Sequence, residues 1–243
     1  MMTTQTSFSP RDRERLSFAQ QRLWLLDRLL REPWVYNSAQ VLRLEGTLDC
    51  SALFAALNEI VRRHEILRTR IEVIDGEPWQ VIDPESNIES VIDDLTGLPQ
   101  TARESEACRR AEEEAHKPFD LARGPVLRAR LLRLAENEHW LLLARHHIVS
   151  DRWSMRVLAD EISALYASNL LGEPPALAAL PVQYADYARW QREWLQGQVL
   201  ENHLDYWRRR LAGQQPIGRP LRASAAGASR SKSTPISPTR SSS

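Results

Sequence analysis

Segments with the hydrophobic period of a helix alternate with segments that have the period of a strand, and this alternation restricts the fold more than any other feature of the sequence. Helices are expected around residues 19–30, 53–64, 101–116 and 158–165. Strand-like segments lie between them: NSAQVLRLEGTL, RTRIEVI, EPWQVI, PVLRARLLRLA and HWLLLARHHIV. Because each element must bury one face, we expect an α/β (α+β two-layer) fold in which helices pack on a mixed, largely antiparallel sheet.

Short capping and turn signals support this division of the chain. Ser17 and Asp49 precede two of the helical segments and are suitable N-caps. Asp75-Gly76 separates two strand-like segments and predicts a tight hairpin, because glycine accepts the positive φ that such a turn requires. Gly172 ends the last of the four helical segments.

Composition excludes several functional classes. The 243 residues suffice for one or two domains with a hydrophobic core. Although 42% of the residues are apolar, no apolar run is long enough for a membrane helix. The 32 basic and 32 acidic residues cancel, so binding to nucleic acid or to a membrane surface is not expected. The first residues, MMTTQTSFSPRDRER, lack the apolar stretch of a secretory signal, and a cytoplasmic location is expected.

The last thirty residues differ in composition from the rest. Residues 214–243 contain eight serines, four prolines and five basic residues, and no acidic or aromatic residue. Such a segment has too few apolar groups to offset the entropy of ordering, so a disordered basic tail is expected. The remaining chain therefore carries a net charge of minus five, since the whole chain sums to zero.

The segment RHHIVSDRWS is the strongest candidate for chemistry. His146 and His147 stand at the end of a strand-like segment, and Asp151 follows four residues later. Because side chains alternate along a strand, the two imidazoles should point to opposite faces, which argues against a shared metal ion. From spacing alone two interpretations remain: a core histidine beside a helix-capping Asp151, or one histidine that faces a site.

Four segments resemble ordered motifs of the condensation domain of nonribosomal peptide synthetases. LSFAQQRLWLLDRL is similar to the family's SxAQxRLWxL, and RRHEILRTR resembles RHExLRTxF up to Ile71 in place of Phe. HHIVSDRWS is similar to HHxxxDG, and YADYARWQ to YxDFAxWQ. The resemblance runs from about Leu16 to Gly213, with Tyr36-Asn37 and PFDLARGPVLR between the motifs.

The resemblance implies a fold and an activity. Family members join two aminoacyl or peptidyl thioesters, each tethered to a carrier domain by a phosphopantetheine arm, and they bind no cofactor or metal directly. Their fold pairs two chloramphenicol-acetyltransferase-like lobes around a channel, so this chain is expected to form the N-terminal lobe. Its partners would be carrier domains and adjacent synthetase modules.

The motif match also assigns roles to individual residues. His147 is the expected catalytic residue, acting as a general base or as a hydrogen-bonding group for the amine and the tetrahedral centre. His146 would be structural. Asp151 is expected to hold the loop through an arginine, either Arg63 or Arg68, although these arginines also suit a solvated helix end.

Large apolar residues in the other motifs are expected to pack rather than to bind substrate. Trp24 and its neighbouring leucines are assigned to the core. The aromatic residues near the end of the resemblance recur at nearly helical intervals and are also assigned to packing: Tyr184, Tyr187, Trp190 and Trp194.

The chain departs from the family pattern in two respects. Arg152 replaces the final Gly of HHxxxDG; if this position requires positive φ, the side chain costs about 1 kcal/mol or more, and Arg152→Gly would restore turnover in a complete domain. Nothing after LDYWRRRLAG resembles the second lobe. The expected organisation is a lead-in (1–15), the lobe (16–180), a helical segment leading to the missing lobe (181–213) and the tail (214–243).

Three functions remain open from the sequence. The first is a truncated condensation domain that forms amide bonds only with a second lobe. The second is a related acyltransferase acting on a small alcohol or amine. The third is a non-catalytic remnant that binds a carrier, which Arg152 and the absent lobe favour.

Overall fold

The computed structural model describes residues 13–175 and 177–213, and two β-sheets organise the first part of the chain. The smaller sheet has the order β1-β4-β3, and all of its pairs are antiparallel. Its strands are β1 (Arg13–Arg15), β3 (Thr69–Ile74) and β4 (Glu77–Ile82). Asp75 and Gly76 join β3 to β4 with φ values of 51° and 82°, so the predicted tight hairpin is confirmed.

The larger sheet is mixed and carries the site. Its order is β2-β7-β6-β5, with antiparallel pairs except for the parallel pair β5 and β6. Its strands are β2 (Asn37–Glu45), β5 (Val91–Asp94), β6 (Leu127–Ala135) and β7 (Glu138–His146). The α/β class and the mixed sheet are as predicted, but the strands divide between two sheets rather than one.

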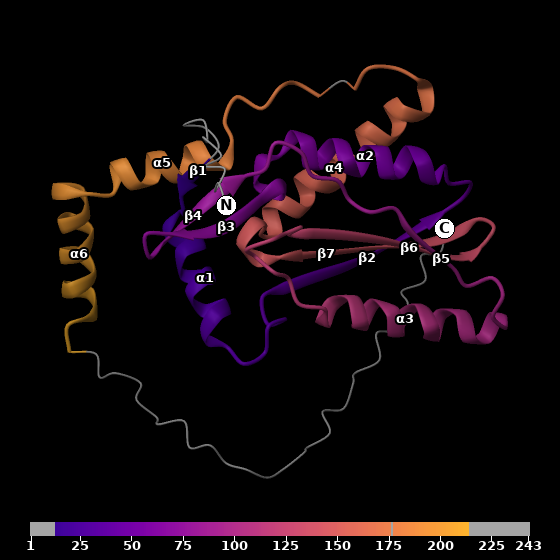
Figure 1. Cartoon of the computed structure of the whole chain (residues 1–243), viewed down its shortest axis with the longest axis horizontal. Helices are drawn as coiled ribbons and strands as arrows, with labels where there is room; N and C mark the ends of the chain where they lie inside the picture. The colour runs from indigo at the N-terminus through magenta and orange to yellow at the C-terminus, as the bar shows by residue number, and fades with distance from the viewer. Residues whose placement is uncertain (1–12, 176, 214–243) are drawn as a thin grey trace, which may run out of the picture. The chain divides into compact units, whose positions relative to one another are not determined.

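Helices cover both faces of the larger sheet (Figure 1). On one face, Leu57 of α2 (Cys50–Arg63) and Leu158 of α4 (Arg152–Leu171) share a core with alternate residues of β6 and β7, among them Leu131 and Leu143. On the other face, α3 (Gln100–His116) buries Ala107 against the same two strands. Both faces of β6 and β7 are therefore apolar, which explains their nearly continuous hydrophobic sequence.

The helix ends follow the capping signals in the sequence. Ser17 caps α1 (Phe18–Leu29) and accepts a hydrogen bond from the backbone N–H of Gln20 at 3.2 Å. Asp49 accepts one from the N–H of Ala52 at 2.9 Å at the start of α2. Gly172 ends α4 in the left-handed conformation with φ 67°. These local signals therefore determine where three of the helices begin or end.

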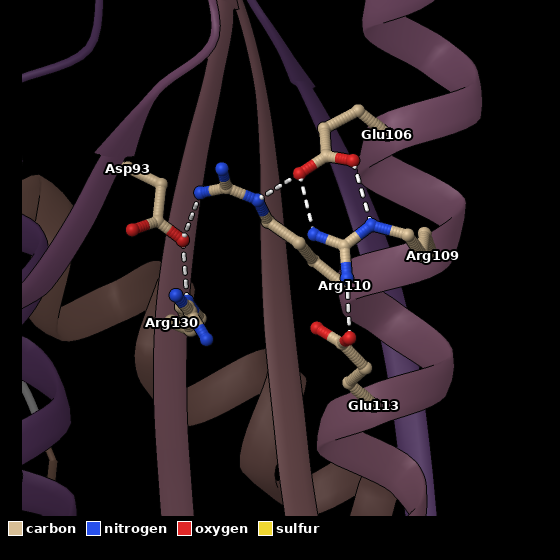
Figure 2. Close-up of polar contacts among 6 residues, drawn as sticks. All are labelled: Asp93, Glu106, Arg109, Arg110, Glu113 and Arg130. Carbon is tan, nitrogen blue, oxygen red and sulfur yellow. Dashed lines mark hydrogen bonds and ion pairs between the residues drawn. The ribbon is translucent and has the colours of Figure 1, made fainter.

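An ion-pair network attaches α3 to the larger sheet (Figure 2). Asp93 on β5 binds Arg110 of α3 at 2.8 Å and also Arg130 of β6. On the helix, Glu106 binds Arg109 at 2.6 Å and Arg110 at 2.8 Å. The hydrogen bond from Arg109, with that from Arg110, lowers the pKa of Glu106 to about 2. The polar helix α3 is therefore attached to the sheet by ion pairs as well as by the buried Ala107.

Two further helices follow in the described chain, α5 (Tyr184–Trp194) and α6 (Gly197–Leu211). Residues up to Val199 form one compact unit, and Leu200 begins a second that includes most of α6. The predicted disordered tail and most of the predicted lead-in lie outside the described residues. No helix in the described residues is long and apolar enough to cross a membrane.

Candidate functional site

The two adjacent histidines lie at the end of β7 in different surroundings. His146 is the last residue of the strand and is fully buried, whereas His147 is exposed and opens a short 3-10 helix, η2 (His147–Val149). The prediction from alternating side chains placed both histidines on the strand, but β7 ends at His146. The separation of the two side chains therefore comes from a change of backbone conformation as well as from the pleat.

His146 belongs to the packed interior. Its ring lies edge-on to Tyr36 and Phe119, and its Nδ1 accepts a hydrogen bond from the N–H of Ile148 at 3.1 Å. This bond leaves the proton of the neutral ring on Nε2, which lies 3.4 Å from Oδ1 of Asp27 in an electrostatic contact rather than a hydrogen bond. Burial lowers the pKa of His146, while the carboxylate of Asp27 opposes this effect in part. The neutral ring is therefore the stable form in the fold.

His147 has the opposite tautomer. Its Nδ1 lies 2.7 Å from the carbonyl oxygen of Ser150, and a carbonyl oxygen can only accept, so Nδ1 carries the proton. Its backbone N–H donates to the carbonyl oxygen of Tyr36 at 2.8 Å, which fixes the start of η2 against β2. The second ring nitrogen, Nε2, then carries a lone pair. A neutral imidazole held in this way can accept a hydrogen bond, or a proton, from a substrate amine.

His147 lines a cavity of about 560 Å³. The walls come from η2 and the residues after it, from α1, from η1 (Glu65–Arg68) and from the start of α5. They include Leu23, Leu67, Met155, Leu158 and Tyr184 together with a few polar groups. A mostly apolar cavity with few polar groups is the usual form of a small-molecule site.

Asp151 acts as a helix cap. Its Oδ1 accepts hydrogen bonds from the backbone N–H of Ser154 at 2.8 Å and from the hydroxyl of Ser154 at 2.7 Å. The backbone N–H of Asp151 donates in turn to Oγ of Ser154 at 3.3 Å, which completes a capping box at the start of α4. These bonds lower the pKa of Asp151, with the backbone bond contributing most. The local interpretation of this residue, a helix cap beside a histidine, is the one that the geometry supports.

The expected pair between Asp151 and an arginine is wrong for both candidate arginines. Arg63 binds Glu161 of α4 at 3.1 Å, and Arg68 binds the carbonyl oxygen of Asp83 and lies 3.5 Å from Glu65. Glu161 thus pairs with the end of α2, and Asp83 directly follows β4 of the smaller sheet. The two arginines therefore support the fold around the cavity rather than the loop that contains Asp151.

The condition under which Arg152 would be strained, a positive φ, is not met. Arg152 is the first residue of α4, and Asp75 is the one non-glycine residue with positive φ in the described chain. Arg152 is exposed and is not among the residues that line the cavity, although Asp151 and Trp153 on either side are. A side chain at this position is therefore compatible with the helical backbone and leaves the cavity open.

The aromatic residues of α5 are more exposed than predicted. Trp190 is 53% exposed and Trp194 46%, and their rings stack at 5.5 Å with an angle of 9° between them. Tyr187, 40% exposed, continues this row and also lines the cavity. The core assignment is likewise incomplete in α1, where Trp24 is only partly buried. Helical spacing alone does not distinguish a packed face from one that lacks a covering layer.

Sequence reasoning missed Arg145, a buried polar residue of the cavity. Its side chain is on β7 two residues before His147, and only 6% of the residue is exposed. Its Nε donates to the hydroxyl of Ser150 at 2.8 Å, the same residue whose carbonyl oxygen accepts from His147. The signal was available, because a charged residue inside an otherwise apolar strand needs an explanation.

A family model described as "Condensation domain" matches residues 11–234. A linear gramicidin synthase of Brevibacillus parabrevis is 48% identical over 209 residues, which is 86% of this chain and 3% of that much longer protein.

Two solved structures extend the comparison. The X-domain in the "Complex of the X-domain and OxyB from Teicoplanin Biosynthesis" is 32% identical with a TM-score of 0.74, covering 86% of this chain and 45% of that chain. The starter condensation domain of rhizomide synthetase RzmA shares the fold at 22% identity with a TM-score of 0.74, covering 84% of this chain and 48% of that one. The chain thus spans about half of each solved structure and a small part of the curated relative.

Proposed function

The chain belongs to the condensation-domain family of nonribosomal peptide synthetases, and we propose that its His147 face is one wall of a site where an amine attacks a thioester. Condensation domains act on carrier-tethered substrates. The product here would be an amide that joins two aminoacyl or peptidyl groups, each presented by a carrier domain on a phosphopantetheine arm. One observation carries the proposal: a tautomer of His147 that leaves Nε2 free in the wall of a mostly apolar cavity.

The proposed reaction uses that lone pair directly. The acceptor amine donates an N–H hydrogen bond to Nε2 while its nitrogen forms a bond to the thioester carbonyl carbon. The tetrahedral centre then expels the donor thiolate as the C–S bond breaks. The proton that leaves the nitrogen reaches the thiolate, either through His147 as general base and acid or after release to solvent.

Catalysis in this proposal requires surroundings that complete the cavity. The chain spans about half of each of the two solved structures described above. An imidazole facing bulk water loses the preorganised, water-excluded environment in which hydrogen bonds stabilise a developing charge. We therefore assign this chain one wall of the reaction channel, with the facing half required for turnover.

The decisive experiment supplies that facing half. Residues 13–213 would replace the equivalent segment in a condensation domain of the linear gramicidin synthase, and amide formation would be followed between two loaded carrier proteins. His147→Gln should lower the rate by about 10²- to 10⁴-fold, the range of general acid–base catalysis. His116→Gln is the matched control, because the Nδ1 of His116 also lies 2.7 Å from a carbonyl oxygen, that of Glu112, but outside the cavity.

A second function, binding of a partner without catalysis, is favoured by a separate observation. The exposed row Tyr187, Trp190 and Trp194 offers apolar contact area, and the related X-domain was solved in a complex with OxyB. If the active chimera and its His147→Gln variant formed product at equal rates, His147 would have no catalytic role. If the chimera bound loaded carriers without forming product, the binding function would be preferred.

A further inference from the structure

Arg145 is a buried cation without a carboxylate partner in the described residues. The residue is 6% exposed, and its Nη1 is buried with no hydrogen-bond partner there. Within the described chain its side chain makes one hydrogen bond, from Nε to the neutral hydroxyl of Ser150. Burial lowers the pKa of Arg145, and no opposing contribution from a carboxylate accompanies it.

Other partly buried arginines of the same fold differ in this respect. Arg128 binds Glu114, Arg63 binds Glu161 at 3.1 Å, and Arg110 binds Asp93 at 2.8 Å. Burying a charge costs several kcal/mol unless an opposite charge or a set of hydrogen bonds compensates it. Arg145 therefore has an unmet demand for an oxygen acceptor that these other arginines do not have.

The position of Arg145 connects this demand to the cavity. The residue lines the cavity and, with His147, is bonded to Ser150, which ties the guanidinium and the imidazole to one residue of the wall. Among the described residues that line the cavity, the formally charged ones are Arg22, Arg145 and Asp151. The carboxylate of Asp151 is occupied by Ser154, so the charge balance of the cavity favours an anion.

We propose that the cavity accepts an acyl group bearing a carboxylate, and that the guanidinium of Arg145 binds this carboxylate. This inference rests on the proposed function, because it names the substrate class of the same site. A planar guanidinium presents paired N–H donors that match the two oxygens of a carboxylate. Arg145 is then a specificity-determining residue: it selects the acyl group, and His147 acts on the amine.

A phosphate on the tethering arm would offer the same oxygen chemistry. The carboxylate of the acyl group is favoured, because Arg145 is buried and shares Ser150 with His147, whereas Arg22 of α1 is exposed to solvent. The two sources are distinguishable by probes that carry only one of the two anions.

The test measures binding to the full 243-residue chain by calorimetry and needs no turnover. The first pair of probes is the N-acetylcysteamine thioester of succinate and its neutral methyl ester. Wild type should bind the succinate thioester at least about tenfold more tightly than its methyl ester, the range of a charge-assisted hydrogen bond. Arg145→Met should abolish the preference, and Arg145→Lys should retain part of it. Arg22→Met, which removes an exposed cation of the same cavity, should leave the preference unchanged.

The midpoint of thermal unfolding is a second readout, and it shows whether the Arg145→Met variant is folded. Because it removes an unpaired buried charge, Arg145→Met should raise the midpoint of thermal unfolding without ligand, whereas loss of a merely structural arginine would lower it.

Three results would overturn the inference. In the first, wild type shows no preference for the carboxylate probe over its methyl ester, or binds neither probe at millimolar concentration. In the second, the preference survives Arg145→Met, and in the third, wild type binds phosphopantetheine more tightly than pantetheine but does not prefer the succinate thioester. If the full chain preferred the carboxylate probe but the chimera formed no amide, only the catalytic proposal would be refuted. Turnover without the preference would refute this inference alone.

Discussion

The Nδ1 of His147 and the carbonyl oxygen of Ser150 are 2.7 Å apart, and this contact orients the exposed imidazole of the site. The neighbouring ring, His146, uses its Nδ1 as an acceptor instead, from the N–H of Ile148. Two consecutive histidines are thus held in opposite tautomers by backbone groups alone. This arrangement fits a structural role for His146 and the chemical role proposed for His147.

The two histidines should differ sharply in their effect on stability. His146→Ala removes a fully buried ring and its hydrogen bond, so the free energy of unfolding should fall by about 2–4 kcal/mol. His147→Ala removes an exposed ring and should change it by less than about 1 kcal/mol. Urea denaturation of both variants measures the difference. Equal losses would show that His147 is also part of the core.

Stability should decline as the pH falls below the ordinary histidine range. Burial lowers the folded-state pKa of His146 and of His139, so the unfolded chain binds protons that the folded chain does not. The stabilisation is complete above the unfolded pKa of about 6.5 and is lost as the pH falls through the folded values. The charged neighbour Asp27 opposes the shift of His146, and Arg133 adds to that of His139 while Asp94 opposes it.

Denaturation curves between pH 8 and pH 5 test this decline. Because the variants start from different stabilities, the slopes with pH are compared rather than the absolute values. His146→Gln and His139→Gln should each flatten the slope, and the exposed His116→Gln should not. An unchanged slope in both buried-site variants would contradict the assignment of these rings as neutral groups.

The start of α4 provides a matched pair of substitutions. Asp151→Ala removes both bonds of the cap to Ser154 and should cost about 1 kcal/mol of stability. Arg152→Gly should cost no more than about 1 kcal/mol, because the backbone there is helical, and it should leave the rate of the chimera unchanged. A faster chimera with Gly at this position would restore the view that Arg152 obstructs the site.

The attachment of α3 should depend on Asp93. Asp93→Asn leaves Arg110 and Arg130 without their shared carboxylate and should lower the free energy of unfolding by about 1–3 kcal/mol (Figure 2). Glu113→Gln, which removes a 58% exposed carboxylate from the same network, should change it by less than about 1 kcal/mol. Thermal unfolding in low and high salt compares them, and equal effects would show that the Asp93 pairs are solvent-screened.

Local signals predicted most of the fold, and long-range surroundings explain what they missed. The caps at Ser17 and Asp49 and the turn at Asp75 depend on a few neighbouring residues, so they were readable. The cap at Asp151 was one of the two interpretations that the local sequence offered, and the arginine pair was wrong because a distant partner depends on the tertiary arrangement. For Trp190, helical spacing indicated a face but could not indicate whether anything covers it.

The same limit explains the site. The motif resemblance drew attention to His147, but the alternation of strand side chains assumed that β7 continues past His146, where it ends. Arg145 was overlooked because its importance depends on burial and on the absence of an acidic partner among the described residues. The charge inside an apolar strand was visible in the sequence, but the burial of Arg145 and its lack of an acidic partner in the described chain were not.

The state of the imidazole of His147 tests the account most directly. Nitrogen-15 NMR of the imidazoles at about pH 8.5, well above the ordinary histidine pKa, reports which ring nitrogen carries the proton, and His147→Gln assigns the signal. The contact with Ser150 predicts a proton on Nδ1 of His147 and none on its Nε2, as for His116, whose Nδ1 also faces a carbonyl oxygen. A proton on Nε2 of His147 would leave no acceptor for an amine and would contradict the proposed chemistry.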